Sequence, residues 1–350
     1  MYIEKVSRKK VIVGMSGGVD SSITAYLLQK EGYEVEGIYM KLHENITGYH
    51  EKNISIVKKV AEYLEIPYHI LDLSQEFSQE IYDYFVQSYI DGITPNPCVK
   101  CNDKIKFGKL FDEAMSLGAD YLATGHYAKT DGNFIYKADD LSKDQSYFLA
   151  QVKKEALAHI IFPMDKYKKE DIKKIASSIP AFEELASQKE SQEICFVDTV
   201  YTDLLKKHTN IDRPGDTLDI DGNVVGHHKG YLHYTIGKRR GFYVHGAHEP
   251  HFVVDMDKET NSITVGKKEE LSITEVICDQ LNMFVDKRHF ECEVKVRFRA
   301  QPVRCQVDIE NNICQIKLSE PIYGVAKGQV AVFYDEEKVI GSGWIIDTYK

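Results

Sequence analysis

Hydrophobic positions in the first 125 residues alternate between short β-branched runs and amphipathic stretches. Val11–Val13 leads into the glycine-rich Gly14–Gly18, and an amphipathic segment then continues to Gly32. This pattern predicts a strand, a tight loop and a helix. The same reasoning predicts further strands over 34–40, 68–73 and 119–124, and helices over 51–65, 75–90 and 103–117. Strands that alternate with helices indicate an α/β domain built on a parallel sheet.

The pattern changes at about residue 210, where short alternating runs are separated by turn signals such as Pro214-Gly215-Asp216. Helical periodicity is nearly absent from there on, which predicts one or two small β domains. The strands are expected over 231–236, 251–255, 262–265, 291–298, 303–309, 313–318, 330–334 and 339–346.

Composition narrows the class of protein. The chain has 350 residues, 43% of them hydrophobic and 28% charged, as in ordinary folded proteins of two or three domains. It contains no apolar run of 18 residues, so we expect no membrane span. Seven cysteines, an odd number in a long chain, favour a reducing compartment, and we expect a cytoplasmic protein.

The formal net charge of −10 disfavours nucleic-acid binding by the surface as a whole. Binding depends on local potential, however, and basic residues cluster within 100–109, 238–240 and 295–304. On charge alone, the simplest interpretation of each cluster is a solvated face.

The loop after the first strand is the strongest candidate for an anion site. Glycines let backbone amides approach an anion, and Asp20, Ser21 and Ser22 are N-cap candidates at a helix N-terminus. The loop is not a Walker A motif, because no lysine follows the glycines, and it does not fit the dinucleotide fingerprint. Gly14-x-Ser16-x-Gly18 does satisfy the G-x-S-x-G nucleophile elbow of hydrolases.

Two further interpretations of this loop remain. One is a tight turn with a purely structural role. The other is the S-G-G-x-D-S loop of the PP-loop ATP pyrophosphatases, which residues 16–21 resemble in full. Those enzymes split ATP into AMP and pyrophosphate. A hydrolase elbow normally lies in the middle of a chain, whereas only ten residues precede this strand.

The loop, Met40 and the segment Thr124–His126 all fall at the carboxyl ends of predicted strands. Ligands bind at the carboxyl ends of the strands in parallel sheets, so these segments favour one nucleotide site.

Cysteines supply a second set of candidate groups. Residues 93–102 lie between two predicted helices, and Pro95 and Pro97 predict a loop that presents Cys98-x-x-Cys101. Cys195 follows far along the chain between apolar neighbours, where an inert buried cysteine is the plainer interpretation. Four further cysteines lie in predicted strands and are assigned to packing: Cys278, Cys292, Cys305 and Cys314.

Eight motifs in order make the chain resemble the tRNA-specific 2-thiouridylases, from about Val11 to Ile346. They are SGGVDSS, TPNPCVKCNDKIKFG, GADYLATGHYA, KDQSYFL, KESQEICFV, GHHKGYLHYTIGKRRG, VRFRAQP and VAKGQVAVFY. The resemblance implies a tRNA sulfurtransferase that adenylates the C2 oxygen of the wobble uridine with ATP. A sulfur nucleophile then attacks C2. It also implies a PP-loop catalytic domain over 1–207, a small β-rich domain over 208–275 and a tRNA-binding β-barrel over 276–350.

The resemblance assigns roles residue by residue. Asp20, Cys101 and the persulfide-carrying Cys195 would be catalytic. ATP, with Mg²⁺, would be held by Gly14, Met15, Ser16, Gly17, Gly18, Val19, Asp20, Ser21, Met40 and Gly125. The target base would lie against Asn96, Pro97 and Cys98. Contacts with tRNA would come from His126, Lys143, Asp144, Gln145, Arg297, Phe298 and Gln329, although His126 could instead simply end its strand.

One departure concerns sulfur delivery, because the family pattern N-P-D-x-x-C has Cys98 in place of Asp here. Cys98, Cys101 and Cys195 resemble the three thiolates that hold a [4Fe–4S] cluster in related tRNA sulfur transferases. A Zn²⁺ site would need a fourth ligand. In the alternative route, Cys195 accepts sulfur from a donor protein and Cys101 resolves the persulfide by exchange.

The implied partners are tRNAs with a wobble uridine, those for Lys, Glu and Gln, and either a sulfur-donor protein or free sulfide; no membrane is expected. Other functions stay open, namely another PP-loop enzyme such as a tRNA lysidine synthetase or an amidotransferase-linked synthetase. A non-enzymatic RNA-binding or metal-binding protein is the alternative from another class.

Overall fold

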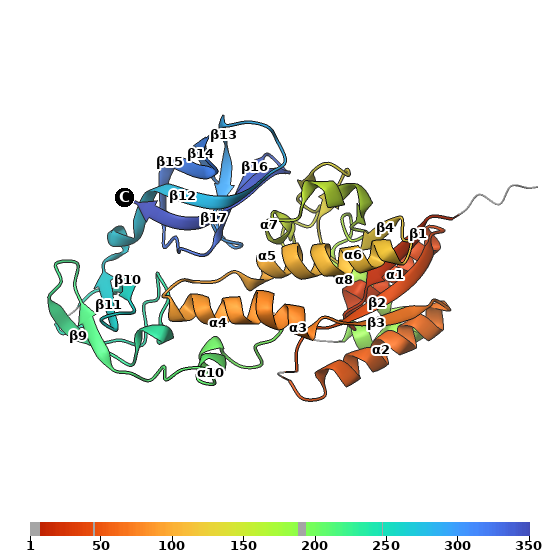
Figure 1. The fold of residues 1–350 in the computed structure, drawn as a ribbon, viewed down its shortest axis with the longest axis horizontal. Coiled ribbons are helices and arrows are strands. Elements are labelled where there is room, and N and C mark those ends of the chain that lie inside the picture. Colours follow the sequence, from red (N-terminus) through yellow and green to blue (C-terminus); the bar gives the residue numbers. More distant parts are fainter. Residues whose placement is uncertain (1–7, 45, 188–193, 247) are drawn as a thin grey trace, which may run out of the picture. The chain divides into compact units, whose positions relative to one another are not determined.

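The computed structural model describes residues 8–44, 46–187, 194–246 and 248–350 (Figure 1). Residues 189–193 of the KESQEICFV motif therefore lie outside the described part of the chain. Two compact units are present, and each draws on several stretches. Unit 1 spans 1–80, 98–196 and 337–339, and unit 2 spans 81–97, 197–336 and 340–350. Within the described ranges, every helix is too short or too polar to cross a membrane.

Unit 1 is built on a five-stranded sheet in which every paired strand runs parallel to its neighbour, as the sequence predicts. Its order is β3 (Tyr68–Asp72), β2 (Glu34–Lys41), β1 (Lys10–Gly14), β4 (Tyr121–Ala123) and β7 (Ile160–Ile161). The central strand β1 is β-branched at Val11–Val13, and all three of these side chains are fully buried. Flanked by strands on both sides and covered on both faces, β1 needs such an uninterrupted apolar run.

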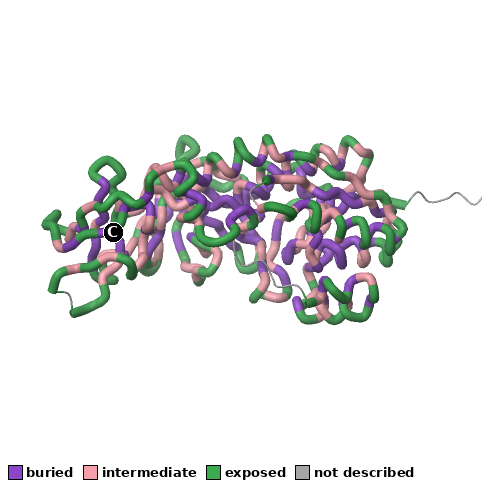
Figure 2. The backbone as a smooth tube through the Cα atoms, turned by 90° about the horizontal axis from the view of Figure 1, so that it is seen from below, coloured by how far each residue is buried: buried purple, intermediate pink, exposed green. Residues whose placement is uncertain are grey.

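Helices cover both faces of this sheet. Val11 and Val13 of β1 lie on one face of the sheet. They share an apolar core with α1 (Val19–Lys30), α2 (Tyr49–Leu64) and α8 (Lys169–Ser177). On the opposite face, Leu110 at the start of α6 (Leu110–Ser116) lies against Gly14. In Figure 2 buried stretches of the tube lie mainly inside, and exposed stretches are frequent on its outer loops.

The stretch that carries the first two cysteines differs from the predicted loop. It is helical from its second proline onward, as α5 (Pro97–Cys101), a π-helical segment η2 (Asn102–Lys109) and α6. Proline is tolerated at the first helical position, because an amide there would have no partner within the helix. Cys98 and Cys101 are therefore three residues apart on one helical turn and share a face.

Unit 2 contains α4 (Asp83–Ile90) and a four-stranded sheet. The sheet has the order β10 (Phe252–Asp257), β11 (Ser262–Gly266), β8 (Gly215–Leu218) and β9 (Val224–His228). The predicted strand over 231–236 is wrong, because a 3₁₀ turn, η5 (Tyr231–His233), stands there. Tyr231, Leu232 and Tyr234 are all buried, so burial does not alternate as it does in a strand.

A closed six-stranded barrel completes unit 2, and this confirms the predicted C-terminal barrel. Its order is β12 (Ser272–Met283), β15 (Ile313–Tyr323), β14 (Val303–Glu310), β13 (His289–Lys295), β16 (Val330–Asp335) and β17 (Lys338–Tyr349), with β12 also paired to β17. The strand β12 was not predicted. The boundaries of three domains stay a prediction.

The remaining elements are short. The first residues of β17 pair with β6 (Ile135–Tyr136), which forms a hairpin with β5 (Lys129–Thr130) in unit 1. The other helical segments are α3 (Ser74–Phe77), η1 (Ser78–Tyr82), α7 (Ser146–Leu149), η3 (Lys154–His159), η4 (Pro180–Phe182), α9 (Glu183–Ala186), α10 (Tyr201–Leu205) and η6 (Lys268–Leu271).

Candidate active site

Three strand ends meet around the glycine loop in unit 1. β1 ends at Gly14 and pairs with β2, which ends just after Met40, while β4 on its other side ends at Ala123. Gly125 then lies against the first turn of α1, where an added Cβ would stand 3.0 Å from the Cβ of Asp20 and from the amide nitrogen of Ser21. The structure thus brings Gly125 to the glycine loop, where a larger side chain would force its neighbours to move.

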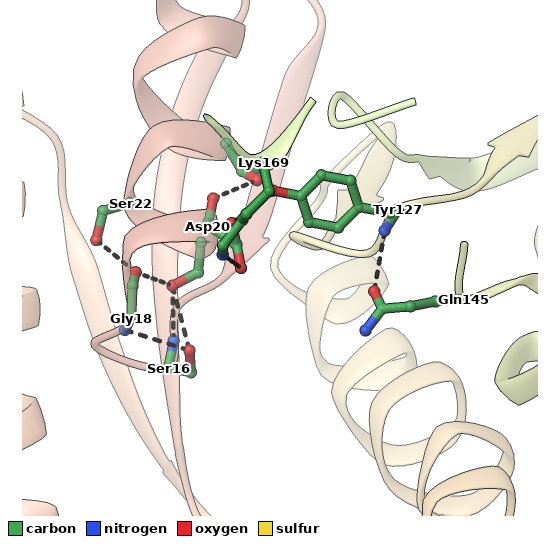
Figure 3. Close-up of polar contacts among 9 residues, drawn as sticks. Ser16, Gly18, Asp20, Ser22, Tyr127, Gln145 and Lys169 are labelled. Atoms are coloured by element: carbon green, nitrogen blue, oxygen red, sulfur yellow. Dashed lines mark hydrogen bonds and ion pairs between the residues drawn. The ribbon is translucent and has the colours of Figure 1, made fainter. Parts of the chain in front are cut away.

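The loop is held by its own hydroxyl groups. The amide of Ser16 donates to Ser21 Oγ at 3.1 Å, and the hydroxyls of Ser21 and Ser22 donate to the Gly18 carbonyl at 3.1 and 3.0 Å (Figure 3). Gly17 adopts a positive φ of 81°, which favours glycine. These bonds fix the loop without any ligand.

The predicted N-cap role of Asp20, Ser21 and Ser22 is wrong. α1 begins at Val19 with Gly18 as its N-cap, so these three side chains belong to the first turn. No side chain caps the helix, since the serine hydroxyls bond back to the carbonyl of Gly18. A helix N-terminus without a capping side chain presents its amides and its positive dipole end to an anion.

Asp20 carries the densest polar contacts near the loop. Lys169 Nζ lies 2.6 Å from its Oδ1 and 2.5 Å from its Oδ2, and the hydroxyl of Tyr127 donates to Oδ1 at 2.9 Å (Figure 3). Tyr127 is in turn fastened to Gln145, whose Oε1 accepts its amide at 3.0 Å and whose amide donates to its carbonyl at 2.8 Å. Lys169 begins α8 and escaped the sequence reasoning, although a lysine at a helix N-terminus opposes the dipole and is a signal.

The hydrolase interpretation gains no support from these contacts. A nucleophilic serine needs a base, most often histidine, within hydrogen-bond reach. In residues 8–44 and the other described ranges, the polar partners of Ser16 Oγ are Ser21 Oγ at 3.3 Å and the amide of Gly18 at 3.4 Å.

The three candidate cysteines lie within one another's electrostatic reach, as the resemblance implies. Burial is the main cause that raises the pKa of Cys101 to about 12, and the nearby Cys195 and Cys98 contribute to the rise. Burial and Cys98 raise the pKa of Cys195 to about 11, and burial raises that of Cys98. Cys101 is buried, whereas Cys98 and Cys195 are exposed; the protein packed around these two still withholds enough water to disfavour their thiolates.

Lys106, in η2, opposes those shifts at all three thiols and lowers the pKa of each. Its Nζ also lies 3.4 Å from His126 Nε2. From the sequence alone, Lys106 is one of several basic residues within 100–109 that are expected to lie on a surface exposed to solvent. Its spacing of five residues from Cys101 gave no signal, because the contact depends on the π-helical geometry of η2.

His126 is buried, and burial followed by Lys106 holds the pKa of its imidazole well below 6.5. Its Nδ1 lies 2.7 Å from the hydroxyl of Thr124. Asp144 is also buried, and its carboxylate accepts the amide of Ala138 and both the amide and hydroxyl of Ser146. The tRNA contacts implied for these two residues stay predictions, and their burial argues for a structural role.

In unit 2, Gln329 is attached to the segment that precedes the cysteines. Its Nε2 donates to the carbonyls of Thr94 and Pro95, both at 3.1 Å, and its Oε1 accepts Asn96 Nδ2 at 3.4 Å. The amide of Asn96 donates to the hydroxyl of Tyr84 at 3.2 Å, and the Asn96 residue is buried. One side chain of the barrel therefore fixes Asn96, the first of the predicted base-binding residues, and the two residues that precede it.

The other predicted tRNA contacts vary in exposure. Arg297 is exposed after β13 and donates through Nη2 to the carbonyl of Tyr323 at 3.4 Å. Phe298 is half-buried, with Lys295 Nζ 5.8 Å from its ring centroid. Lys143 is half-buried beside the turn that carries Asp144.

Cys98, Cys101 and Cys195 are the candidate ligands for a metal ion or an iron–sulfur cluster. In the described part of the chain, no three side chains among His, Cys, Asp and Glu are arranged to hold a metal ion. The three thiols have the right chemistry for a [4Fe–4S] cluster, but as placed they do not fit one.

Three family models match consecutive stretches of the chain. Family models described as "tRNA methyl transferase HUP domain", "tRNA methyl transferase PRC-barrel domain" and "Aminomethyltransferase beta-barrel domain" match residues 9–199, 202–267 and 273–345. Among solved structures, the "U34-tRNA thiolase NcsA from Methanococcus maripaludis with its [4Fe-4S] cluster" is 21% identical with a TM-score of 0.37, over 59% of this chain and 67% of that one. That likeness is too weak to bear on the cysteines.

Curated relatives match nearly the whole chain. The "tRNA-specific 2-thiouridylase MnmA 1" of Aliarcobacter butzleri is 61% identical over 98% of this chain and 100% of that protein. The "tRNA-specific 2-thiouridylase MnmA" of Nitratiruptor sp. is 54% identical over 97% of this chain and 99% of that protein. The chain belongs to the tRNA-specific 2-thiouridylase family.

Proposed function

We propose that the protein is a sulfurtransferase that replaces the C2 oxygen of a wobble uridine in tRNA with sulfur, at the expense of ATP. The observation that carries this is that one unit holds a glycine loop at a helix N-terminus together with three thiols from distant stretches. An amide-like oxygen is a poor leaving group, so adenylation converts it into AMP before sulfur attacks.

ATP would bind at the carboxyl ends of β1, β2 and β4. We assign the polyphosphate to the loop over 14–21 and the nucleoside to Met40 and Gly125. Support comes from the meeting of these strand ends and from the close packing of Gly125 on α1. Mg²⁺ is expected as the partner of the polyphosphate, with Asp20 as its candidate protein ligand.

The wobble base would be flipped out of the anticodon stack, because its C2 is otherwise out of reach of a side-chain nucleophile. We assign Asn96, Pro97 and Cys98 to the base. Lys143, Gln145, Arg297 and Phe298 are assigned to the rest of the tRNA, where phosphate contacts position the substrate and base contacts select it. The expected substrates are the tRNAs for Lys, Glu and Gln, in the cytoplasm.

Sulfur would travel through Cys195 and Cys101. In this route a donor protein leaves a persulfide on Cys195, and its terminal sulfur attacks C2 while AMP departs. Cys101 then attacks Cys195 Sγ, releasing the thiolated uridine and leaving a Cys101–Cys195 disulfide that an external thiol must reduce. The nearness of the two thiols supports this exchange. Cys98 would be a bystander in the relay and a ligand in the cluster alternative.

The decisive experiment is formation of 2-thiouridine on a purified wobble-uridine tRNA under anaerobic conditions, with ATP and sulfide. Iron-reconstituted and iron-stripped protein are compared. Product from sulfide only with iron would assign all three cysteines to a cluster, whereas product from the iron-stripped protein that requires an added persulfide donor would support the persulfide relay. If neither gives product, even when a persulfide donor is added, the proposed function fails.

The rival functions predict different ATP chemistry. Formation of 2-thiouridine that depends on Cys101 separates this enzyme from other PP-loop synthetases, which do not need the cysteines, and release of pyrophosphate only with tRNA marks an enzyme that acts on tRNA. A non-enzymatic RNA-binding or metal-binding protein would release no pyrophosphate at all.

A further inference from the structure

The glycine loop lacks the lysine that ends a Walker A motif, yet the fold supplies one from a remote helix. Lys169 lies 149 positions beyond Asp20 in the chain, and its Nζ contacts both carboxylate oxygens (Figure 3). We propose that Lys169 binds the β- and γ-phosphates of ATP and the pyrophosphate that forms from them. This inference rests on the proposed use of ATP.

The ammonium is placed where an anion can reach it. The side chain of Lys169 is only 11% exposed, but that of its partner Asp20 is 31% exposed. The pair therefore lies at the edge of the loop, with the lysine stem inside the protein and the carboxylate toward solvent. A polyphosphate brings several anionic oxygens and can compete with one carboxylate for a charge-assisted bond.

Tyr127 keeps the ammonium beside the loop from a second side. Its ring centroid is 5.8 Å from Lys169 Nζ, and its hydroxyl holds Asp20 Oδ1 at 2.9 Å. The hydrogen bond between Tyr127 and Asp20 does not involve the ammonium, so it need not break when Lys169 turns toward a phosphate. Asp20 is then a positioning residue for Lys169 in the absence of ATP.

A purely structural role explains Lys169 poorly. It is the first residue of α8, where the helix dipole disfavours a cation, although Glu170 and Asp171 follow it. Removing an ammonium from water is also costly, and a well-packed apolar pair is often as stable as a buried ion pair. A residue that is unfavourable for the helix in which it lies, and that adds little stability elsewhere, is typical of a functional position.

The test separates phosphate binding from neutralisation of Asp20. Asp20→Asn removes the carboxylate that Lys169 would otherwise neutralise and serves as the background, and Lys169→Met is added to it. Binding of Mg²⁺-free inorganic pyrophosphate and of adenosine is measured by calorimetry for the full-length single and double variants. Thermal unfolding shows whether each variant is folded. Lys174→Met, an exposed lysine of the same helix, is the matched control.

If Lys169 binds phosphate, the double variant binds pyrophosphate about 10- to 100-fold more weakly than Asp20→Asn alone, the range expected for loss of a charge-assisted bond. Its affinity for adenosine and that of the Lys174→Met protein for both ligands stay within about twofold of their references. Equal pyrophosphate affinity of the single and double variants would overturn the inference, as would a parallel loss of adenosine binding. If wild-type protein binds neither ATP nor pyrophosphate, the proposed function fails as well.

Discussion

The thiols at the centre of the site are protonated at neutral pH before substrate arrives. Burial is the main reason, with pKa values of about 12 for Cys101 and about 11 for Cys195, and neighbouring thiolates add to it. The positive charge of Lys106 acts in the opposite direction, because it stabilises each thiolate and so lowers the pKa of both thiols. A protein that must carry sulfur without losing it to solutes gains from thiols that are unreactive at rest.

Alkylation of Cys195 by iodoacetamide tests this balance. Below its raised pKa only a small fraction is thiolate, so the rate should rise about tenfold per pH unit between pH 7 and 10. Lys106→Met should slow the reaction at every pH in that range, while Lys104→Met, an exposed neighbour, should not. Peptide mass spectrometry gives the rates. A rate at pH 7 equal to that of a free thiol would refute the raised pKa.

A buried neutral histidine makes stability depend on pH. The pKa of His126 in the fold is well below its ordinary 6.5, so the unfolded chain binds the extra proton first. Its contribution is complete above about pH 6.5 and is lost as pH falls below that value.

We therefore expect the melting temperature to drop between pH 7.5 and 5.5, and to drop less in His126→Asn than in wild type. Scanning calorimetry at both pH values measures this. An equal drop in the two proteins would show that other groups, such as His43, whose pKa is also lowered by burial, carry the effect.

At the scale of elements, the barrel fixes the segment before the cysteines through Gln329. Its amide is already engaged by Thr94, Pro95 and Asn96 in the absence of tRNA. The resemblance makes Gln329 a tRNA contact, whereas the structure favours a role in positioning the base-binding segment.

Gln329→Ala distinguishes the two roles. If Gln329 positions the segment, kcat for thiolation should fall about tenfold while the Kd for tRNA changes little, because misplacement of a reacting group costs rate. Gln306→Ala, an exposed barrel glutamine bonded to Glu291, is the control. A weaker Kd with unchanged kcat would instead support the direct contact with tRNA.

Gly125, just after the end of β4, packs against the first turn of α1 and so shapes the proposed ATP site. A methyl group at Gly125 would lie 3.0 Å from backbone and side-chain atoms of Asp20, closer than such atoms normally approach. Gly125→Ala should therefore shift the first turn of α1 and weaken ATP binding. Gly118→Ala at an open turn should cost stability but leave ATP binding intact, since nothing lies within 4 Å of its added carbon. Calorimetric titration with ATP compares the two.

The helices and strands that could be predicted well from the sequence are those with an unbroken pattern of hydrophobic residues. β1, β2, α1 and α2 show clear runs or periodicity, and each was found within a few residues. β12 was missed, because its outward positions are polar and its register shifts twice against β17, so no simple alternation survives. The early start of α5 was missed because two prolines suggested a loop, and only the helix position of Pro97 explains the difference.

At the scale of the whole molecule, the net negative charge disfavours a polyanionic substrate such as tRNA only when all residues are summed. The net charge of −10 would repel tRNA, so attraction must come from local clusters such as the basic residues after β13. Arg297 is exposed in that cluster and is the sharpest probe of it.

Arg297→Ala should weaken tRNA binding and flatten its dependence on salt, because one fewer phosphate is neutralised and fewer counterions are released. Filter binding at several salt concentrations gives the slope. Arg288→Ala, an exposed arginine outside the cluster, should keep the wild-type slope. An unchanged slope in both variants would remove Arg297 from the interface.

Some residues of the candidate site could be predicted from the sequence, and others come together only in the folded protein. The glycine loop and Cys98-x-x-Cys101 are contiguous, so spacing and residue type were enough to find them. Lys169 and Lys106 were missed, because their roles come from contacts with distant or helically rearranged partners. Cys195 was found only through the resemblance, since an exposed cysteine between apolar neighbours carries no chemical signal of its own.

The interleaving of the two units has a consequence for how the protein comes into being. The catalytic unit includes residues 337–339, whose strand pairs with the hairpin at 129–136. Translation must therefore reach residues 337–350 before either unit has all its strands. Neither unit can complete its fold while the chain is still being made up to that point.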